Sequence, residues 1–169
     1  MTSDVVIAIL AFGHILSAIA WLGGGLLTGF VIGPSLRNIA PAAALEFNAK
    51  VIPKVLRFIQ AALGLTFLFG LLLLYYFSSG DLSWLMNSTP GYVLSSGILV
   101  AIVTAIVAMA FVFPAFRQVA RISSAALQSG QPPAPEMMKY GKRARMGSMM
   151  GVALLLFVLA TMVISGFVY

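Results

Sequence analysis

Four long apolar stretches, separated by shorter connections with polar and charged residues, dominate the pattern along the chain. They cover about residues 5–32, 55–77, 92–116 and 146–169. As helices, which rise ~1.5 Å per residue, all four are long enough to cross the ~30 Å hydrocarbon layer of a bilayer. Because the connections are too short for another domain, the pattern predicts an all-α fold. It is a single transmembrane domain over residues 1–169, built as an antiparallel four-helix bundle.

The connections carry their own structural signals. A first-turn proline predicts a short helix over residues 41–50 that lies along the inner membrane surface. The apolar and basic alternation after Pro114 predicts that the third span continues as a helix beyond the membrane. The proline-rich run at residues 130–135 cannot be helical, so a linker is predicted there.

Composition supports a membrane environment. Of the 169 residues, 61% are hydrophobic and 8% are charged, with a mean hydropathy of +1.05, and one soluble core could not bury so much apolar surface. The net charge of +6 is concentrated between apolar runs, which argues against nucleic-acid binding. The lack of cysteine excludes disulfides, iron–sulfur clusters and thiolate metal sites. The predicted partner of most of the surface is therefore the lipid bilayer.

The basic residues predict the topology. All ten Lys and Arg residues fall in the first and third connections or at their edges. The second connection, residues 78–90, has none and contains Asp81. By the positive-inside rule the basic loops are cytoplasmic and both termini lie on the outer side. The sequence thus predicts a multi-pass protein of the plasma membrane.

The first span carries the only histidine, His14, in a polar stripe. At ~100° per residue, one face of this helix is polar or small and the rest is aliphatic or aromatic. The stripe consists of His14, Ser17, Ala18, Trp21, Gly25, Thr28 and Gly29. An ionisable group ~14 Å below the membrane surface is costly in contact with lipid, so we expect this face to point into the bundle.

Three roles are open for His14. It can ligate a haem or metal through a neutral imidazole nitrogen, relay protons, or hydrogen-bond a neighbouring hydroxyl. Counting depth from the outer surface places the hydroxyls of Thr104 and Thr161 near it as hydrogen-bond partners. The same count places Met162 near it as a second, soft axial ligand.

Arg57 enters the inner edge of the second span, roughly level with Trp21. Its guanidinium can pair with a carboxylate or a haem propionate, stack on Trp21, or extend to lipid headgroups. All four acidic residues fall outside the spans. That distribution argues against a carboxylate-driven proton or cation antiporter.

Methionine and glycine form further patterns in the fourth span. Met146, Met149 and Met150, called here the methionine triplet, lie on one helix face, where they either bind Cu(I) or fill gaps between helices. Glycines at four-residue spacing form close-approach surfaces that suit packing within the bundle, homo-oligomers or a larger membrane complex. These glycines are Gly25, Gly29 and Gly33 on the first span and Gly147 and Gly151 on the fourth. They indicate that the two spans pack closely in the cytoplasmic half.

The first helix resembles that of a loose group of small membrane proteins. The similarity lies in His14-x6-Trp21-x-Gly23-Gly24, followed by Gly29-Phe30-Val31-Ile32-Gly33-Pro34. The group includes the copper resistance D family, the HemJ type of protoporphyrinogen oxidase and uncharacterised four-helix families. Arg57-Phe58 is similar to the Arg-Phe that opens the second span of copper resistance D domains.

The resemblance implies two kinds of chemistry. In the HemJ type, the histidine that matches His14 is associated with haem and porphyrin chemistry together with a membrane lysine. The copper resistance D type is taken to move copper across the membrane. No span of this chain contains lysine, so whether the protein is an enzyme is open at this point.

Together these features predict a small membrane protein that binds haem b or a related metal cofactor at His14, for electron transfer or cofactor handling. Trp21 would shape the pocket, Met162 would be the second ligand, and Arg57 would balance negative charge. The first alternative is a non-catalytic accessory subunit of a larger membrane complex. The second is copper passage, with His14 and the methionine triplet as ligands.

Overall fold

The computed structural model describes residues 2–167, with side chains from residue 4 onward, and every regular element in this range is a helix. The elements are α1 (Thr2–Leu26), η1 (Leu27–Ile32), α2 (Gly33–Ser35), α3 (Pro41–Lys50), α4 (Ile52–Phe77), η2 (Ser83–Met86), α5 (Thr89–Val107), η3 (Ala108–Val112), α6 (Phe113–Ser129) and α7 (Glu136–Ser165). Four helical runs in the described range are long and apolar enough to cross a membrane: Asp4–Ser35, Ile52–Phe77, Thr89–Ser129 and Glu136–Ser165. The predicted all-helical class is confirmed, and so is the presence of four helices long and apolar enough to span a membrane.

Two π-helical segments, η1 and η3, interrupt the long helices. Each ends two residues before a proline, Pro34 or Pro114. Proline lacks an N–H, and its ring crowds the carbonyl four residues earlier, so regular α-helical pairing fails just upstream of it. A wider turn re-pairs the neighbouring backbone groups and lets the helix continue. As a result the helices run on to Ser35 and Ser129 instead of stopping at the prolines.

The connections take the predicted forms. The short helix α3 covers the predicted residues 41–50 and starts with its proline. Helix α6 continues from the third span to Ser129, where Gly130 takes a left-handed φ of 68° and donates its N–H to the carbonyl of Ala126 at 3.0 Å. No helix forms over residues 130–135. Helix α7 then begins at Glu136, ten residues before the predicted fourth span, because its basic first turns are helical too.

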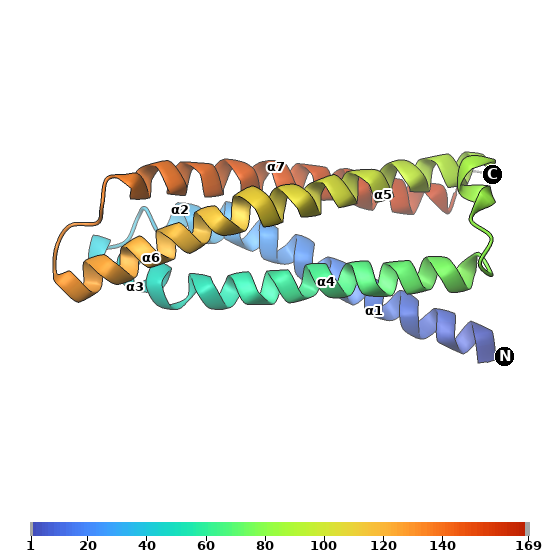
Figure 1. Cartoon of the computed structure of the whole chain (residues 1–169), viewed down its shortest axis with the longest axis horizontal. Helices are drawn as coiled ribbons and strands as arrows, with labels where there is room; N and C mark the ends of the chain where they lie inside the picture. The colour runs from blue at the N-terminus through green and yellow to red at the C-terminus, as the bar shows by residue number, and fades with distance from the viewer. Residues whose placement is uncertain (1, 168–169) are drawn as a thin grey trace.

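The long helices lie as two pairs, α1 with α4 and α5 with α7 (Figure 1). Helices α3 and α6 pack against each other at one end of the molecule. Both chain ends lie at the other end, together with the connection between α4 and α5. Figure 1 also shows the N-terminal half of α1 diverging from α7. The two pairs therefore meet mainly in the half nearer α3 and α6.

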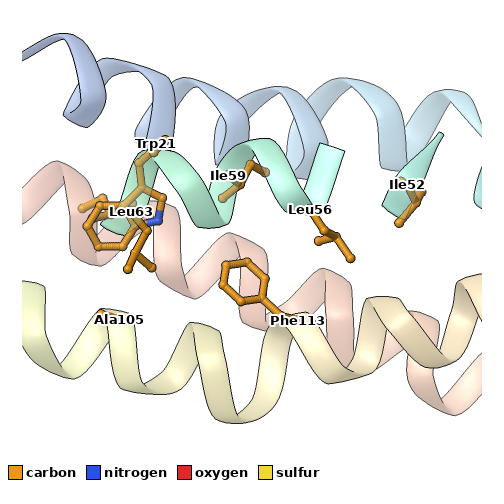
Figure 2. Packing of buried hydrophobic residues seen from close by; sticks show 9 residues of the cluster. Trp21, Ile52, Leu56, Ile59, Leu63, Ala105 and Phe113 are labelled. Atoms are coloured by element: carbon orange, nitrogen blue, oxygen red, sulfur yellow. The ribbon is translucent and has the colours of Figure 1, made fainter. Parts of the chain in front are cut away.

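The hydrophobic core lies where the pairs meet (Figure 2). Trp21 from α1 and Phe113 from α6 reach into it, and α4 contributes most of the remaining side chains. The cluster consists of Trp21, Ile52, Leu56, Ile59, Ala62, Leu63, Ala105, Phe113 and Leu155. The buried hydrophobic contacts that join the two pairs thus concentrate in one half of the bundle.

The polar stripe of the first span faces the protein, as predicted. Ser17, Trp21, Thr28 and Gly29 are the buried residues of this span, and His14 is half-buried. The aliphatic and aromatic residues on the other face, such as Phe12, are exposed. Burial of the small and polar side is what the cost of polar groups in lipid requires.

The glycine surfaces are only partly used as predicted. A Cβ at Gly25 would lie 3.3 Å from Val152, and one at Gly29 would lie 3.7 Å from Ser148, so α1 and η1 do approach α7 closely. Gly147, however, packs against η3: a Cβ there would lie 2.6 Å from Val112 Cγ2. Each of these glycines thus packs against a larger side chain of the neighbouring helix and not against another glycine, because a glycine leaves the space that the larger side chain fills.

Candidate functional site

His14 docks on helix α4. Its Nδ1 lies 3.0 Å from the backbone carbonyl oxygen of Thr66. The ring lies directly over Gly70, where a Cβ would be 2.9 Å from Cε1 and 3.0 Å from Nδ1. Any side chain at position 70 would therefore push the imidazole away. The pair of Thr66 and Gly70, one helical turn apart, forms the seat of the histidine.

The hydrogen bond selects the tautomer of His14. A carbonyl oxygen only accepts hydrogen bonds, so Nδ1 must carry the proton and donate it to Thr66. In the neutral imidazole this leaves a lone pair on Nε2. Nε2 is 4.0 Å from the Cβ position at Gly70, compared with 3.0 Å for Nδ1, so it is directed away from that residue. Metal-binding histidines typically show this arrangement, with one nitrogen anchored and the other available.

The predicted hydroxyl partners of His14 were wrong. Thr104 donates its hydroxyl to the carbonyl of Val100 at 2.7 Å, and Thr161 donates to the carbonyl of Val158 at 2.8 Å. Threonine in an apolar helix commonly satisfies its hydroxyl within its own helix in this way. The histidine is then left to bond the neighbouring helix α4, whose backbone approaches closely at Gly70.

Met162 lies at about the depth of His14, but its helix, α7, is separated from α1 at this level. Gly25 faces Val152. Along α1, His14 lies eleven residues from Gly25, and along α7, Met162 lies ten residues from Val152. Both counts run toward the end of the molecule where the chain ends lie. At ~1.5 Å per residue the two side chains are level to within about one residue. Met162 is half-buried, and the divergence of α1 from α7 in Figure 1 separates the two helices at this level.

Trp21 lies two turns farther along α1 and is a core residue. It is 5% exposed, and its ring centroid lies 6.0 Å from that of Phe67 at an interplanar angle of 48°. A small cavity of about 50 Å³ adjoins it, lined also by Gly25, Thr28 and Ser148. That volume suits one or two waters and is far too small for a porphyrin. The burial of Trp21 is therefore explained by the packing of the two helix pairs against each other.

Arg57 is exposed on the second turn of α4. Within residues 4–167 the cation–π contact is made by Arg143, whose guanidinium carbon lies 5.0 Å from the centroid of Phe111. Arg57 does not stack on Trp21, which is buried among core residues. Of the three predicted roles, extension toward headgroups and charge balance remain.

The methionine triplet lies on the outside of α7. The exposed fractions of its members are 60% for Met146, 40% for Met149 and 54% for Met150. In the described part of the chain no group of three His, Asp or Glu side chains could hold a metal ion. Cu(I) binding by the triplet stays a prediction, and its sulfurs do not lie in the bundle core.

Sequence reasoning missed Thr66 and Gly70. A backbone carbonyl has no sequence signature, but Gly70 did offer a signal, as a glycine in an otherwise bulky apolar run at about the right depth. Comparison with protein-family models, with curated proteins and with solved structures finds no match for this chain. Its interpretation therefore rests on the residues and their geometry.

Proposed function

We propose that this protein is an antiparallel four-span bundle of the plasma membrane that binds haem b or a related metal cofactor at His14. Both termini lie outside and the basic connections lie in the cytoplasm. This orientation is supported by the distribution of Lys and Arg, and by the position of both chain ends opposite the helix pair α3 and α6, which belongs to the basic connections (Figure 1). Electron transfer or cofactor handling is the proposed role.

The observation that carries the proposal is the hydrogen bond from His14 Nδ1 to the carbonyl of Thr66. It holds the imidazole in one tautomer and one orientation, and it leaves Nε2 as a ligand. The hydrogen bonds of the described residues include none to Nε2, and Nε2 is not among their buried polar atoms without a partner, so this atom is accessible. The half-buried ring can thus still be reached by a ligand.

His14 would supply one nitrogen ligand, its Nε2, to a haem. A haem bound there would supply one-electron redox chemistry. His14 would hold the iron, and the Thr66 carbonyl would keep the ring oriented and raise its basicity. Met162, at the same depth, is the candidate for the second ligand, and Arg57 is the candidate for balancing a propionate at the inner edge. Trp21 is buried on the interior side of α1.

Haem reconstitution of the purified protein tests this proposal. We expect a Soret band in the wild type that is lost in His14→Ala and retained in Ser17→Ala. The control removes a buried polar group one turn away whose hydroxyl bonds only its own helix. A Met162→Leu variant should keep the band but shift it, because the proposed second ligand would be lost. No band in the wild type, or equal bands in the wild type and His14→Ala, would rule out the proposal.

A second candidate function is supported by unfilled glycines. A Cβ at Gly23 or Gly64 would meet nothing within 4 Å, although both lie inside membrane-length helices. Such open positions let another helix approach closely, which favours an accessory subunit of a larger membrane complex. Purification from the native membrane in mild detergent tests this. A stable monomer or self-dimer without a stoichiometric partner would count against it.

A further inference from the structure

A groove lies between the start of α4 and one face of α6, far from His14. Its volume is about 410 Å³, and its walls include Pro53, Leu56, Arg117, Arg121, Ser124 and Gln128. The four α6 residues follow one another at helical spacing, so they present one continuous polar face. The groove is therefore lined by apolar residues on the α4 side, and by these hydrogen-bond donors together with Ala120 and Ala125 on the α6 side.

The groove carries uncompensated positive charge. None of its lining residues is acidic. Of the described carboxylates, Glu46 is paired with Lys50, and Asp4 and Asp81 lie near the opposite end of the molecule. Glu136 begins α7 beyond the linker that follows α6. Arg117 and Arg121 are exposed, lie one turn apart and share a single cavity, so their like charges favour an anion between them.

The groove lies at the level of the lipid headgroups. The rise from Arg57 to Phe77 at ~1.5 Å per residue is about 30 Å, which equals the hydrocarbon thickness. Pro53 and Leu56 precede Arg57 on α4 and so lie at the inner boundary. The groove thus opens where phosphate groups of the inner leaflet are found, and it is also accessible to soluble phosphates of the cytoplasm.

We propose that this groove is a binding site for a phosphate group, held by Arg117 and Arg121. Guanidinium groups bind phosphate oxygens in two parallel hydrogen bonds. Ser124 and Gln128 supply neutral donors farther along the face, and Pro53 and Leu56 accommodate the carbon atoms of a phosphate ester. The proposal does not depend on the cofactor at His14, since the two sites lie on different helix faces at different depths.

Native mass spectrometry of the delipidated full-length protein tests the proposal. The probes are dioleoyl phosphatidylglycerol, the zwitterionic dioleoyl phosphatidylcholine and inorganic pyrophosphate. The variant is Arg117→Gln with Arg121→Gln. The matched control is Arg37→Gln with Arg145→Gln, which removes the same charge from exposed residues outside the groove. We expect the groove variant to bind the preferred probe at least about tenfold more weakly and the control to bind like the wild type.

The outcomes separate the two phosphate sources. Arginine-dependent retention of phosphatidylglycerol over phosphatidylcholine identifies a lipid headgroup, and arginine-dependent binding of pyrophosphate alone identifies a soluble phosphate. Equal weakening in both double variants would show diffuse attraction and overturn the proposal, as would the absence of binding. Ser124→Phe provides a second test, because it fills the groove without changing its charge. It should abolish binding in the same way, and unchanged binding in this variant would also overturn the proposal.

Discussion

The seat of His14 makes a sharp prediction for Gly70→Ala. The added Cβ would lie 2.9 Å from His14 Cε1, whereas ordinary contact begins at 3.4 Å. The ring must therefore move away from α4 by about 0.5 Å or rotate. A displacement of this size lengthens the 3.0 Å bond from Nδ1 to the Thr66 oxygen to about 3.5 Å, where a hydrogen bond is effectively lost.

Gly70→Ala should change the tautomer of His14 without much change in the stability of the protein. Loss of the hydrogen bond costs about 1 kcal/mol, while replacing a helical glycine by alanine gains about 1 kcal/mol. The free energy of unfolding of Gly70→Ala should thus change little. The tautomer of His14 should change clearly, from Nδ1–H alone to a mixture with Nε2–H, because nothing then holds the proton on Nδ1.

Two measurements check this prediction: chemical unfolding in detergent micelles, and nitrogen-15 NMR of the single labelled histidine. Gly64→Ala is the matched control on the same helix, because its Cβ would meet nothing within 4 Å. It should gain up to about 1 kcal/mol without changing the tautomer. A pure Nδ1–H tautomer in Gly70→Ala would refute the reasoning, and so would the same tautomer mixture in the Gly64→Ala control.

Three further predictions concern other parts of the molecule. Trp21→Ala should destabilise the protein by about 3–5 kcal/mol, measured by chemical unfolding, because it opens a cavity where the helix pairs meet; a change below about 1 kcal/mol would contradict the core assignment. Replacing the whole methionine triplet by leucine should leave unfolding nearly unchanged, because these side chains are exposed; copper passage predicts that Cu(I) binding is lost in this variant, and unaltered binding would exclude that function. The hydrogen bond and charge of Lys50 lower the pKa of Glu46 below its ordinary value of 4.5. The pair should therefore support helix α3 above this pH and stop doing so as the pH falls through the lowered pKa. The protection of the α3 amides, which is their exchange rate relative to the intrinsic rate of an unfolded chain at the same pH, should then fall on acidification in the wild type, and Glu46→Gln should abolish that fall.

Much of the architecture follows from local signals. Hydropathy and length predict the four apolar helices. Pro41 predicts the start of α3, and the glycine and prolines of residues 130–135 predict the linker. The burial of Trp21 and Thr28 follows from helical periodicity alone. The helix ends were harder to place, because basic residues such as Arg121 and Lys139, which the sequence predicts outside the membrane, belong to the same continuous helices as the apolar spans.

The sequence by itself determined which four segments are helices long and apolar enough to cross a membrane, and which face of the first helix turns inward. These properties depend on each segment's own transfer free energy and period. Only the tertiary structure decided what His14 touches. Depth counting placed it level with three other helices, but the small residue Gly70 let α4 approach the ring, and a backbone carbonyl became its partner. Every residue carries such a carbonyl, so the choice among them is made by how the helices pack.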